Sequence, residues 1–339
     1  MNDEIERKPG RAAVSVTDLL VRYGVLAMAV LLTIYFVAAI PGFGSFATMN
    51  SIFQAQAVAA IAALGMTLAA VVGDLDLSVG ATAGLSVTVA AMVMIRFNLT
   101  GVTAVILCLL AGLLVGCLNS VLIVALKIPE LLATLGMMFT IQGLKKWLVD
   151  GQTLTTGMTL PNGEKLVGKF DPVFSAIDGK RIVGVPISVV ILLVLAVLMW
   201  ALLERTRYGR VFYAVGGNPE AARLAGARVN RYRFAAYAMS GVLASIAGII
   251  LASRLRQGDV TAGDSVLLDA VAMTLIGFAV LGARKPNVFG TVVGAIFIGV
   301  LLQGLTQSGL SYFTQDLIKG AVLLLSLILS FSLSRSRAK

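Results

Sequence analysis

Residues 204–233, ERTRYGRVFYAVGGNPEAARLAGARVNRYR, form a polar break between two apolar runs of the chain. The runs are ISVVILLVLAVLMWALL (187–203) and FAAYAMSGVLASIAGIILAS (234–253). The break carries seven arginines and only two acidic residues, Glu204 and Glu220, although charged residues make up just 13% of the chain. Because basic residues accumulate in the cytoplasmic loops of helical membrane proteins, this stretch predicts such a loop between two membrane-spanning helices.

Within this break, residues 218–226 predict a short helix. Asn218 can cap its start with a side-chain oxygen, and Pro219 suits the first helical position because its φ is already fixed near the helical value. Glu220 falls in the first turn, where the positive end of the helix dipole favours a carboxylate. Gly226 follows where the helix can end.

Glu220, Ala221, Ala222 and Gly226 form the pattern EAA-x3-G. The two alanines favour helix and leave a smooth surface. The pattern resembles the EAA-x3-G loop of ABC importer permeases, in which a short helix docks into a groove on the ATP-hydrolysing subunit. The resemblance implies that these four residues couple the chain to an ATPase. The pattern alone is equally compatible with an ordinary cytoplasmic helix between two spans.

Composition places the chain in the membrane. Hydrophobic residues make up 58% of the 339 residues, in runs of about 20 that glycines interrupt, which is typical of spanning helices and not of barrel strands. The net charge of +10 comes from loops and tails that would contact anionic lipid, so we expect no nucleic-acid partner. The chain has no histidine, which excludes imidazole-based metal sites and proton relays, and we expect no metal site.

The apolar runs predict an all-α, polytopic transmembrane bundle of about ten spans. These spans are residues 23–40, 52–72, 81–97, 101–126, 131–149, 184–203, 234–253, 267–283, 288–306 and 313–333. The positive-inside rule then places both termini in the cytoplasm. The expected organisation is a cytoplasmic tail at 1–22, a transmembrane permease domain at 23–333 and a second cytoplasmic tail at 334–339. Within the domain, 204–233 is the cytoplasmic coupling loop and 150–183 is an external loop.

The external loop, residues 150–183, is rich in turn-forming residues and nearly balanced in charge. Its composition indicates no independent hydrophobic core. A loop of this length is commonly either functional or disordered. Two interpretations therefore stay open: a docking face for a soluble partner, or an inert solvated loop.

A second informative stretch, GDLDLSVG at residues 73–80, lies between two apolar runs. Asp74 and Asp76 are costly inside a membrane unless they are paired or meet water, so with Ser78 they predict a translocation path at a break in a helix. The flanking glycines would let the helix stop and restart. The alternative is a simple cytoplasmic turn between two spans. Whether the side chains would meet substrate hydroxyls or hold the break in shape stays open.

Two pairs of glycines have the small-xxx-small spacing of closely packed membrane helices. Gly80 and Gly84 open one apolar run, and Gly290 and Gly294 open another, each after a polar break. This spacing predicts close helix contacts at both places.

Several ordered motifs resemble the permease subunits of the ribose, xylose, galactose and arabinose class of ABC sugar importers. The segment GDLDLSVGATAGLSV is similar to GGIDLSVG of that class, with an extra acid at Asp74. Further similar motifs are Tyr213-Ala-Val-Gly-Gly-Asn218, NRYRFAAYAMSGVLASIAGIILASRL, Thr261-Ala-Gly263 and Leu268-Asp269-Ala270. A second departure is Leu281–Asn287, which replaces the class's Gly-Gly-x-Gly turn. The resemblance covers residues 50–330.

This resemblance implies a chain without its own ATP site, since ATP and Mg would bind to a partner ATPase subunit. It further implies a soluble sugar-binding protein, a second permease copy or homologue, and a multi-pass location in the bacterial inner membrane. The substrate would be a pentose or hexose sugar or a related polyol, which the sequence does not identify. No Walker-type phosphate loop is present in the chain.

Two other functions remain to be weighed. A proton-coupled secondary transporter could use Asp74 or Asp76 as its titrating group, but it would leave the EAA-type loop unexplained. An intramembrane enzyme would need a constellation of acid, base or metal-binding residues, which a chain without histidine and with scattered acids does not provide.

Overall fold

The computed structural model describes residues 16–160, 163, 165–279, 285–311, 313–322 and 324, and over these ranges it is a bundle of helices. The helices are α1 (Val16–Ala39), α2 (Phe46–Val71), α3 (Val79–Ala91), α4 (Gly101–Ser120), α5 (Glu130–Leu148), α6 (Pro172–Gly179), α7 (Ile187–Trp200), α8 (Arg207–Gly217), α9 (Pro219–Leu224), α10 (Val229–Leu255), α11 (Asp264–Ala279) and α12 (Val288–Gln307), and residues 313–322 are also helical. Single π-helical turns, η1 (Met92–Arg96), η2 (Val121–Ala125) and η3 (Ala201–Arg205), extend α3, α4 and α7.

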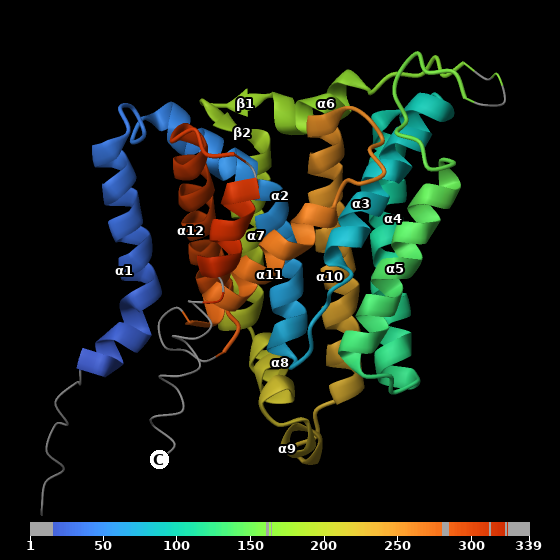
Figure 1. Ribbon diagram of the computed structural model, residues 1–339. Coiled ribbons are helices and arrows are strands. Elements are labelled where there is room, and N and C mark those ends of the chain that lie inside the picture. Colours follow the sequence, from blue (N-terminus) through green and yellow to red (C-terminus); the bar gives the residue numbers. More distant parts are fainter. Residues whose placement is uncertain are drawn as a thin grey trace, which may run out of the picture.

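The bundle is built around α2 and α10, which lie in its middle (Figure 1). Every residue of α2 from Gln56 to Val71 is buried, as expected for a helix that is apolar on all sides. At the crossing of α4 and α10, a Cβ atom on Gly112 or Gly241 would overlap the main chain of the other helix. Small residues therefore let these backbones touch, which is how membrane helices gain packing energy.

Six helices are long and apolar enough to cross a membrane, among the described residues. They are Phe46–Val71, Val79–Arg96, Gly101–Ala125, Ile187–Arg205, Val229–Leu255 and Val288–Gln307. The protein is thus a polytopic helical membrane protein. Each of the ten predicted apolar ranges falls mainly on helix where it is described, although the range 184–203 begins with a turn and strand β2 (Val185–Pro186), while residues 280–284 and 325–333 lie outside the described part.

The helix α1 begins at Val16, two turns before Tyr23, so the last seven residues of the predicted N-terminal tail are helical. Residues 1–15 of that tail and all of the C-terminal tail at 334–339 lie outside the described residues. A helix can extend beyond the membrane, so the tail at 1–22 stays a prediction.

The external loop predicted at 150–183 forms an ordered cap on one end of the bundle, opposite α8 and α9 (Figure 1). It contains α6, and a two-stranded antiparallel hairpin, β1 (Arg181–Ile182) with β2 (Val185–Pro186), follows it. Leu154, Leu166 and Phe174 of this segment are buried against the helices below. The described part of this segment is therefore packed on the bundle, and its role as a docking face or an inert loop stays a prediction.

Two aspartates anchor the cap. Asp171 caps α6 and accepts a hydrogen bond from the N–H of Gly101 at the start of α4 (2.9 Å), and these backbone hydrogen bonds lower its pKa. The Asp178 carboxylate pairs with Arg254 of α10 (2.9 Å). The backbone N–H of Asp178 donates a hydrogen bond to the Ser253 hydroxyl (3.0 Å). Burial alone would raise the pKa of Asp178, but the hydrogen bond and charge of Arg254, together with the neighbouring Ser188 and Gln54 side chains, hold the pKa below its usual value.

Candidate functional site

The short helix expected in the 204–233 loop is α9, and its ends are built as the sequence predicts. The Asn218 side chain accepts a hydrogen bond from the N–H of Ala221 (3.0 Å), and Pro219 is the first helical residue. Gly226 follows the helix with φ +86°, a left-handed conformation that glycine adopts without strain. Glu220 has 85% of its side chain exposed and lies 3.7 Å from Arg223.

The expected smooth surface of α9 includes only one of its two alanines, because Ala221 is exposed but Ala222 is buried against the bundle. The helix α10 begins at Val229, so residues 229–233 of the predicted loop form its first turns. Arg233 consequently faces into the bundle, where it pairs with an acid, and not toward lipid headgroups.

The α8 helix connects α9 to the bundle. The hydroxyl of Tyr213 donates to Glu204 (2.9 Å), which joins α8 to the end of η3, and burial together with this carboxylate raises the pKa of Tyr213. At the other end of α8, Gly216 touches the main chain of residues 71–73, so closely that a Cβ atom there would overlap the Val71 carbonyl. Only Gly217 and Asn218 therefore separate α9 from a residue in direct contact with the end of α2.

The predicted break at residues 73–80 lies between α2 and α3. The α2 helix ends at Val71, Gly73 has φ +92°, and α3 begins at Val79. Asp74 accepts hydrogen bonds from Nε (2.9 Å) and Nη2 (2.7 Å) of Arg233. Asp76 accepts one from the hydroxyl of Ser240 (2.7 Å).

These contacts place the break inside the bundle. Arg233 and Ser240 are seven residues apart in α10, which corresponds to roughly 10 Å along the helix axis. The connection thus runs along α10 almost to its middle, and Figure 1 shows α3 starting partway along the bundle. A simple turn at the end of two complete spans does not fit this geometry.

Asp76 and Ser78 use their hydrogen-bonding capacity within the protein. Asp76, only 1% exposed, accepts from the N–H (3.0 Å) and the hydroxyl (2.6 Å) of Ser78 as well as from Ser240. Asn119 of α4 donates to the Ser78 hydroxyl (2.8 Å). This network holds the interrupted backbone in place, since a buried carboxylate is tolerated only where donors surround it.

Sequence reasoning missed three partners in this network: Arg233, Ser240 and Asn119. Each lies far along the chain from the aspartates, 41 to 164 residues away from its hydrogen-bonding partner. Ser240 and Asn119 are polar residues inside apolar runs, and this pattern could have indicated that they bond to another polar group in the bundle. The network does not include Glu220, Ala221, Ala222 or Gly226, which lie at the far end of α8.

A second non-helical segment, between α10 and α11, contacts the start of α3. After α10 the chain turns back at Arg256 (φ +52°) and re-enters the bundle, where Lys145 of α5 donates to the carbonyl of Ala262 (3.0 Å). Gly263 then packs on the main chain of α3 at Gly80 and Gly84, and α11 begins at Asp264. The close contact predicted for Gly80 and Gly84 is confirmed, and Gly290 and Gly294 likewise contact the main chain of α11.

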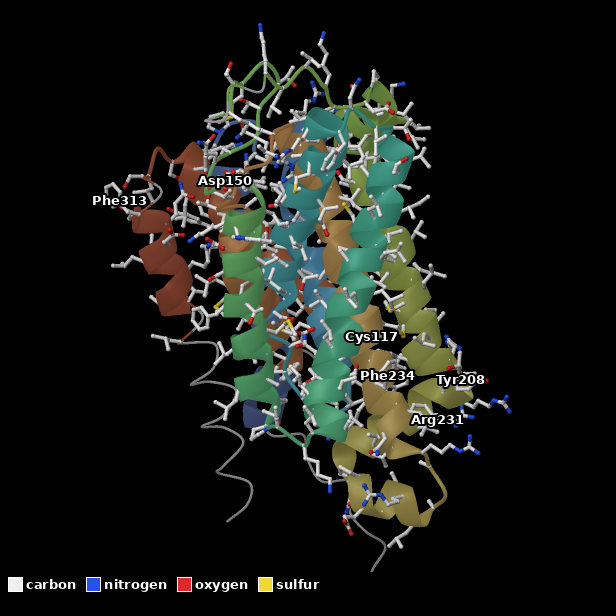
Figure 2. The ribbon with its side chains drawn as sticks, turned by 90° about the vertical axis from the view of Figure 1, so that its right-hand side faces the viewer. Cys117, Asp150, Tyr208, Arg231, Phe234 and Phe313 are labelled. Carbon is white, nitrogen blue, oxygen red and sulfur yellow. The ribbon has the colours of Figure 1, made fainter. Side chains whose placement is uncertain are left out.

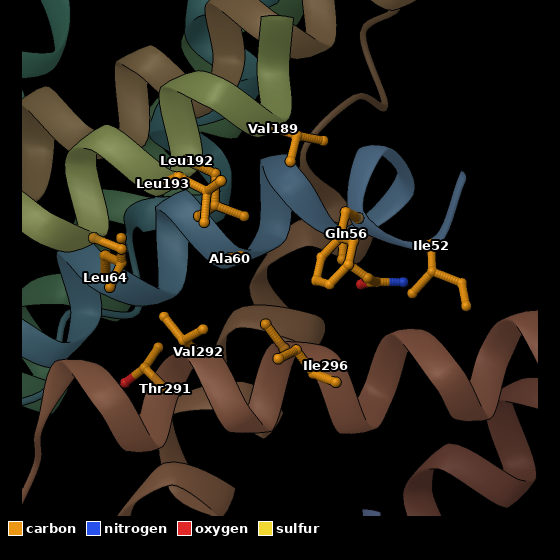
Figure 3. A pocket seen from close by; sticks show the side chains of 13 residues that line it. Ile52, Gln56, Ala60, Leu64, Val189, Leu192, Leu193, Thr291, Val292 and Ile296 are labelled. Atoms are coloured by element: carbon orange, nitrogen blue, oxygen red, sulfur yellow. The ribbon is translucent and has the colours of Figure 1, made fainter. Parts of the chain in front are cut away.

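An apolar groove lies between α2, α7 and α12 (Figure 3). It is lined mainly by aliphatic side chains such as Leu64, Leu192 and Ile296, with Gln56 and Thr291 as its polar members. Thr291 is already bonded to Thr67 (2.7 Å). Because its lining is almost entirely apolar, the groove offers little to a hydroxyl-rich ligand. Within the part of the chain that the structure describes, no three acidic or cysteine side chains come together to hold a metal ion.

The fold and the two interruptions define a polytopic membrane protein with a discontinuous helix at its centre, an architecture used by transporters. Residues 47–327 match the family described as branched-chain amino acid transport system / permease component. The chain belongs to this family, and it is therefore a transporter permease component and not an enzyme.

Several relatives match over most of their length. The ribose import permease protein RbsC of Escherichia coli K12 is 35% identical over 287 residues, which cover 84% of this chain and 86% of that protein. The autoinducer 2 import system permease protein LsrD of Enterobacter sp. 638 is 33% identical and covers 82% of each chain. The probable ABC transporter permease protein YphD of E. coli K12 is 30% identical and covers 93% of this chain and 91% of that protein. No solved structure matches the chain.

Proposed function

We propose that this chain is the permease subunit of an ABC importer that carries a pentose or hexose sugar, or a related polyol, into the cell. A separate ATPase subunit would bind ATP and Mg, and a soluble sugar-binding protein would deliver the substrate. Two permease copies or homologues would enclose one path in the bacterial inner membrane. The names of the relatives, which include a ribose import permease, support this substrate class.

The observation that carries the proposal is the construction of α9. Its cap, its exposed Glu220 and its left-handed Gly226 produce a short rigid helix that projects from one end of the bundle (Figure 1). An isolated six-residue helix is not stable by itself, so the capping and the burial of Ala222 must hold it in shape. A projecting helix maintained in this way is what an ATPase groove would require.

The proposed topology has about ten spans and both termini in the cytoplasm, with tails at 1–22 and 334–339. The loop 204–233 with α8 and α9 would be cytoplasmic, and the cap formed by 150–183 would be external, where the binding protein docks. The placement of the cap and α9 at opposite ends of the bundle supports opposite sides of the membrane for these two segments.

In this proposal Asp74, Asp76 and Ser78 belong to the wall of the translocation path as positioning residues. Their burial and their hydrogen bonds to Arg233 and Ser240 support a role in holding the helix break. An Asp76→Asn variant with unchanged uptake would remove Asp76 from this role. The pairing of Asp74 with Arg233 speaks against a freely titrating Asp74, on which a proton-coupled transporter would depend.

The test is uptake by proteoliposomes that contain this chain, its cognate ATPase and its sugar-binding protein. We expect radiolabelled ribose to accumulate only with ATP inside the ATPase-facing compartment, and a protonophore to leave the rate unchanged. The same assay is then repeated with autoinducer 2 in place of ribose, as the second substrate to be tested. Uptake without the ATPase, driven by a proton gradient, would contradict the proposal.

Gly226 provides a sharper test of the coupling role. A Cβ atom at Gly226 would meet no atom within 4 Å, so a substitution there strains the left-handed backbone and adds bulk in open space. We expect Gly226→Trp to abolish ATPase binding and ATP-driven uptake. Gly226→Asn is the matched control, because asparagine tolerates the left-handed conformation, and should retain most activity. Normal assembly and transport by Gly226→Trp would refute the role of α9.

A further inference from the structure

An ion pair on the face of α11 lies outside the network at the helix break. Asp269 of α11 and Lys319 of the helical segment 313–322 are joined at 2.7 Å, and both side chains are partly exposed. Asp316 lies 3.4 Å from the same ammonium and is 71% exposed. Figure 2 shows the segment that follows Phe313 standing at the edge of the bundle.

This ion pair lies at about the middle of the bundle's height. The hydroxyl of Thr274 in α11 donates to the carbonyl of Ala63 (3.2 Å), which sets the level of α11 against α2. Asp269 precedes Thr274 by five residues, or roughly 7.5 Å along the helix. That displacement puts Asp269 near the middle of the 26-residue α2.

Charges at this depth do not face lipid, because burying them in hydrocarbon costs several kcal/mol. The same face of α11 is open on the N-terminal side of Asp269, because Ser265, one turn earlier, is exposed. The face of α7 is different, since its exposed residues, such as Leu193 and Val197, are aliphatic and suit lipid. The α11 face therefore borders water.

Asp269 also retains hydrogen-bonding capacity that Asp76 lacks. Its Oδ1 atom accepts from Lys319, and among the described residues no donor bonds its Oδ2 atom. A half-free carboxylate beside an ammonium can accept from one hydroxyl of a polyol while the ammonium donates to the next. Such a pair distinguishes hydroxyl-bearing solutes from their deoxy analogues, because removing a hydroxyl leaves a charged group unpaired.

We propose that Asp269, with Lys319 and Ser265, is a substrate-contacting site in the translocation path, and that it takes uncharged polyols with adjacent hydroxyl groups. This inference rests on the proposed function and deepens it. It places part of the substrate selectivity in the membrane subunit itself, on a face separate from Asp74, Asp76 and Ser78.

The first test compares ribose with 2-deoxyribose in the reconstituted importer, with the binding protein saturated by either sugar. We expect wild type to favour ribose, and Asp269→Asn to transport ribose roughly tenfold more slowly, the size expected for one hydrogen bond to a charged group. In this variant, the ratio of the ribose transport rate to the 2-deoxyribose transport rate should fall toward one. Lys127→Asn is the matched control, because it also removes one charge: Lys127 is exposed between η2 and α5 in a left-handed conformation that asparagine accepts, and this variant should leave the rate and the ratio unchanged.

A charge exchange separates substrate contact from a purely structural ion pair. The double variant Asp269→Lys with Lys319→Asp retains the attraction between the two helices. If the pair only holds the helices together, this variant recovers the wild-type rate and sugar ratio, and the inference is wrong. If Asp269 contacts substrate, the variant assembles with the ATPase, unfolds at the wild-type temperature, and still loses the preference for ribose.

Thiol labelling tests whether the face borders water, without depending on transport. With Cys108 and Cys117 replaced by alanine, Ser265→Cys should react with a charged, membrane-impermeant thiol reagent, and ribose should slow that reaction. Leu193→Cys on the lipid-facing side of α7 should not react. An unreactive Ser265→Cys would mean that a second copy or lipid covers the face, and would overturn the inference even if ATP-driven uptake is intact. Failure of wild-type uptake itself would instead count against the proposed function.

Discussion

At the scale of single residues, the pair of Asp74 and Arg233 shows how a strongly basic loop can contain one arginine with a different role. Arg233 is largely withdrawn from solvent and bonded to Asp74 through two nitrogens, whereas Arg231, two residues earlier, is exposed. Removing one partner from a buried pair leaves an uncompensated charge, which costs more than the pair itself contributes.

Arg233→Gln should therefore lower the free energy of unfolding by roughly 3 kcal/mol. Arg231→Gln, the matched control in the same turn, should change it by less than about 0.5 kcal/mol. Thermal unfolding of the detergent-purified protein measures both. The double variant Asp74→Asn with Arg233→Gln should regain part of the loss. Equal effects of the two arginine variants would show that the pair does not stabilise the break.

Local chemistry explains which residue-level predictions succeeded. Asn218, Pro219 and Gly226 act on their immediate neighbours, so their capping and terminating roles could be predicted from sequence and are confirmed. The partners of Asp74 and Asp76 lie 159 and 164 residues away, and only the packing of α10 against the break brings them together. Sequence identified the acids as unusual but could not identify what neutralises them.

At the scale of helices, glycines differ sharply in what they do. A Cβ atom on Gly84 of α3 would overlap the carbonyl of Ala262 and crowd the Lys145 ammonium, whereas one on Gly136 of α5 meets nothing within 4 Å. The first glycine permits the re-entrant segment to cross α3. The second only weakens its own helix.

Gly84→Ala should thus destabilise the protein by about 1–3 kcal/mol through overpacking. Gly136→Ala should instead stabilise it by up to about 1 kcal/mol, because alanine favours helix. Chemical unfolding in mixed micelles compares the two variants. A stabilising Gly84→Ala would show that the contact between α3 and the 261–264 segment is loose.

The cap formed by residues 150–183 gives a prediction about pH. Because the pKa of Asp178 is held below its usual value, its pairing with Arg254 stabilises the docked cap above about pH 4, and that contribution is lost as the pH falls through the lowered pKa. Hydrogen exchange of α6 should be slower in wild type than in Asp178→Asn at pH 6. The difference should vanish in strong acid. A difference that persists there would assign the docking to other contacts.

At the scale of the whole molecule, the proposed orientation places α9 and the external cap on opposite sides of the membrane. Leu224 of α9 is 90% exposed and Val167 of the cap is 70% exposed, so both positions accept a label. With the native cysteines removed, Val167→Cys should react with an impermeant thiol reagent added to intact cells whose outer membrane has been permeabilised. Leu224→Cys should react only after the inner membrane is opened. Labelling of both positions from the same side would contradict the topology.

The sequence predicted the helical bundle well because long apolar runs form helices in a membrane whatever surrounds them. It did not predict that the 256–263 segment re-enters the bundle or that α6 docks on α10, because both depend on contacts between distant segments, such as Lys145 with Ala262 and Arg254 with Asp178. The face that carries Asp269 and Lys319 was missed for the same reason: neither residue is unusual until the other is beside it.

The contact of Gly216 with residues 71–73 has a mechanical consequence. Side chains can absorb small movements by changing rotamer, but here two main chains touch with no side chain between them. A force applied to α9 therefore passes through α8 to the end of α2 with little slack, and arrives next to the backbone that carries Asp74. The backbone contact at Gly216 thus connects the surface of α9, where an ATPase subunit would bind, to the interruption between α2 and α3.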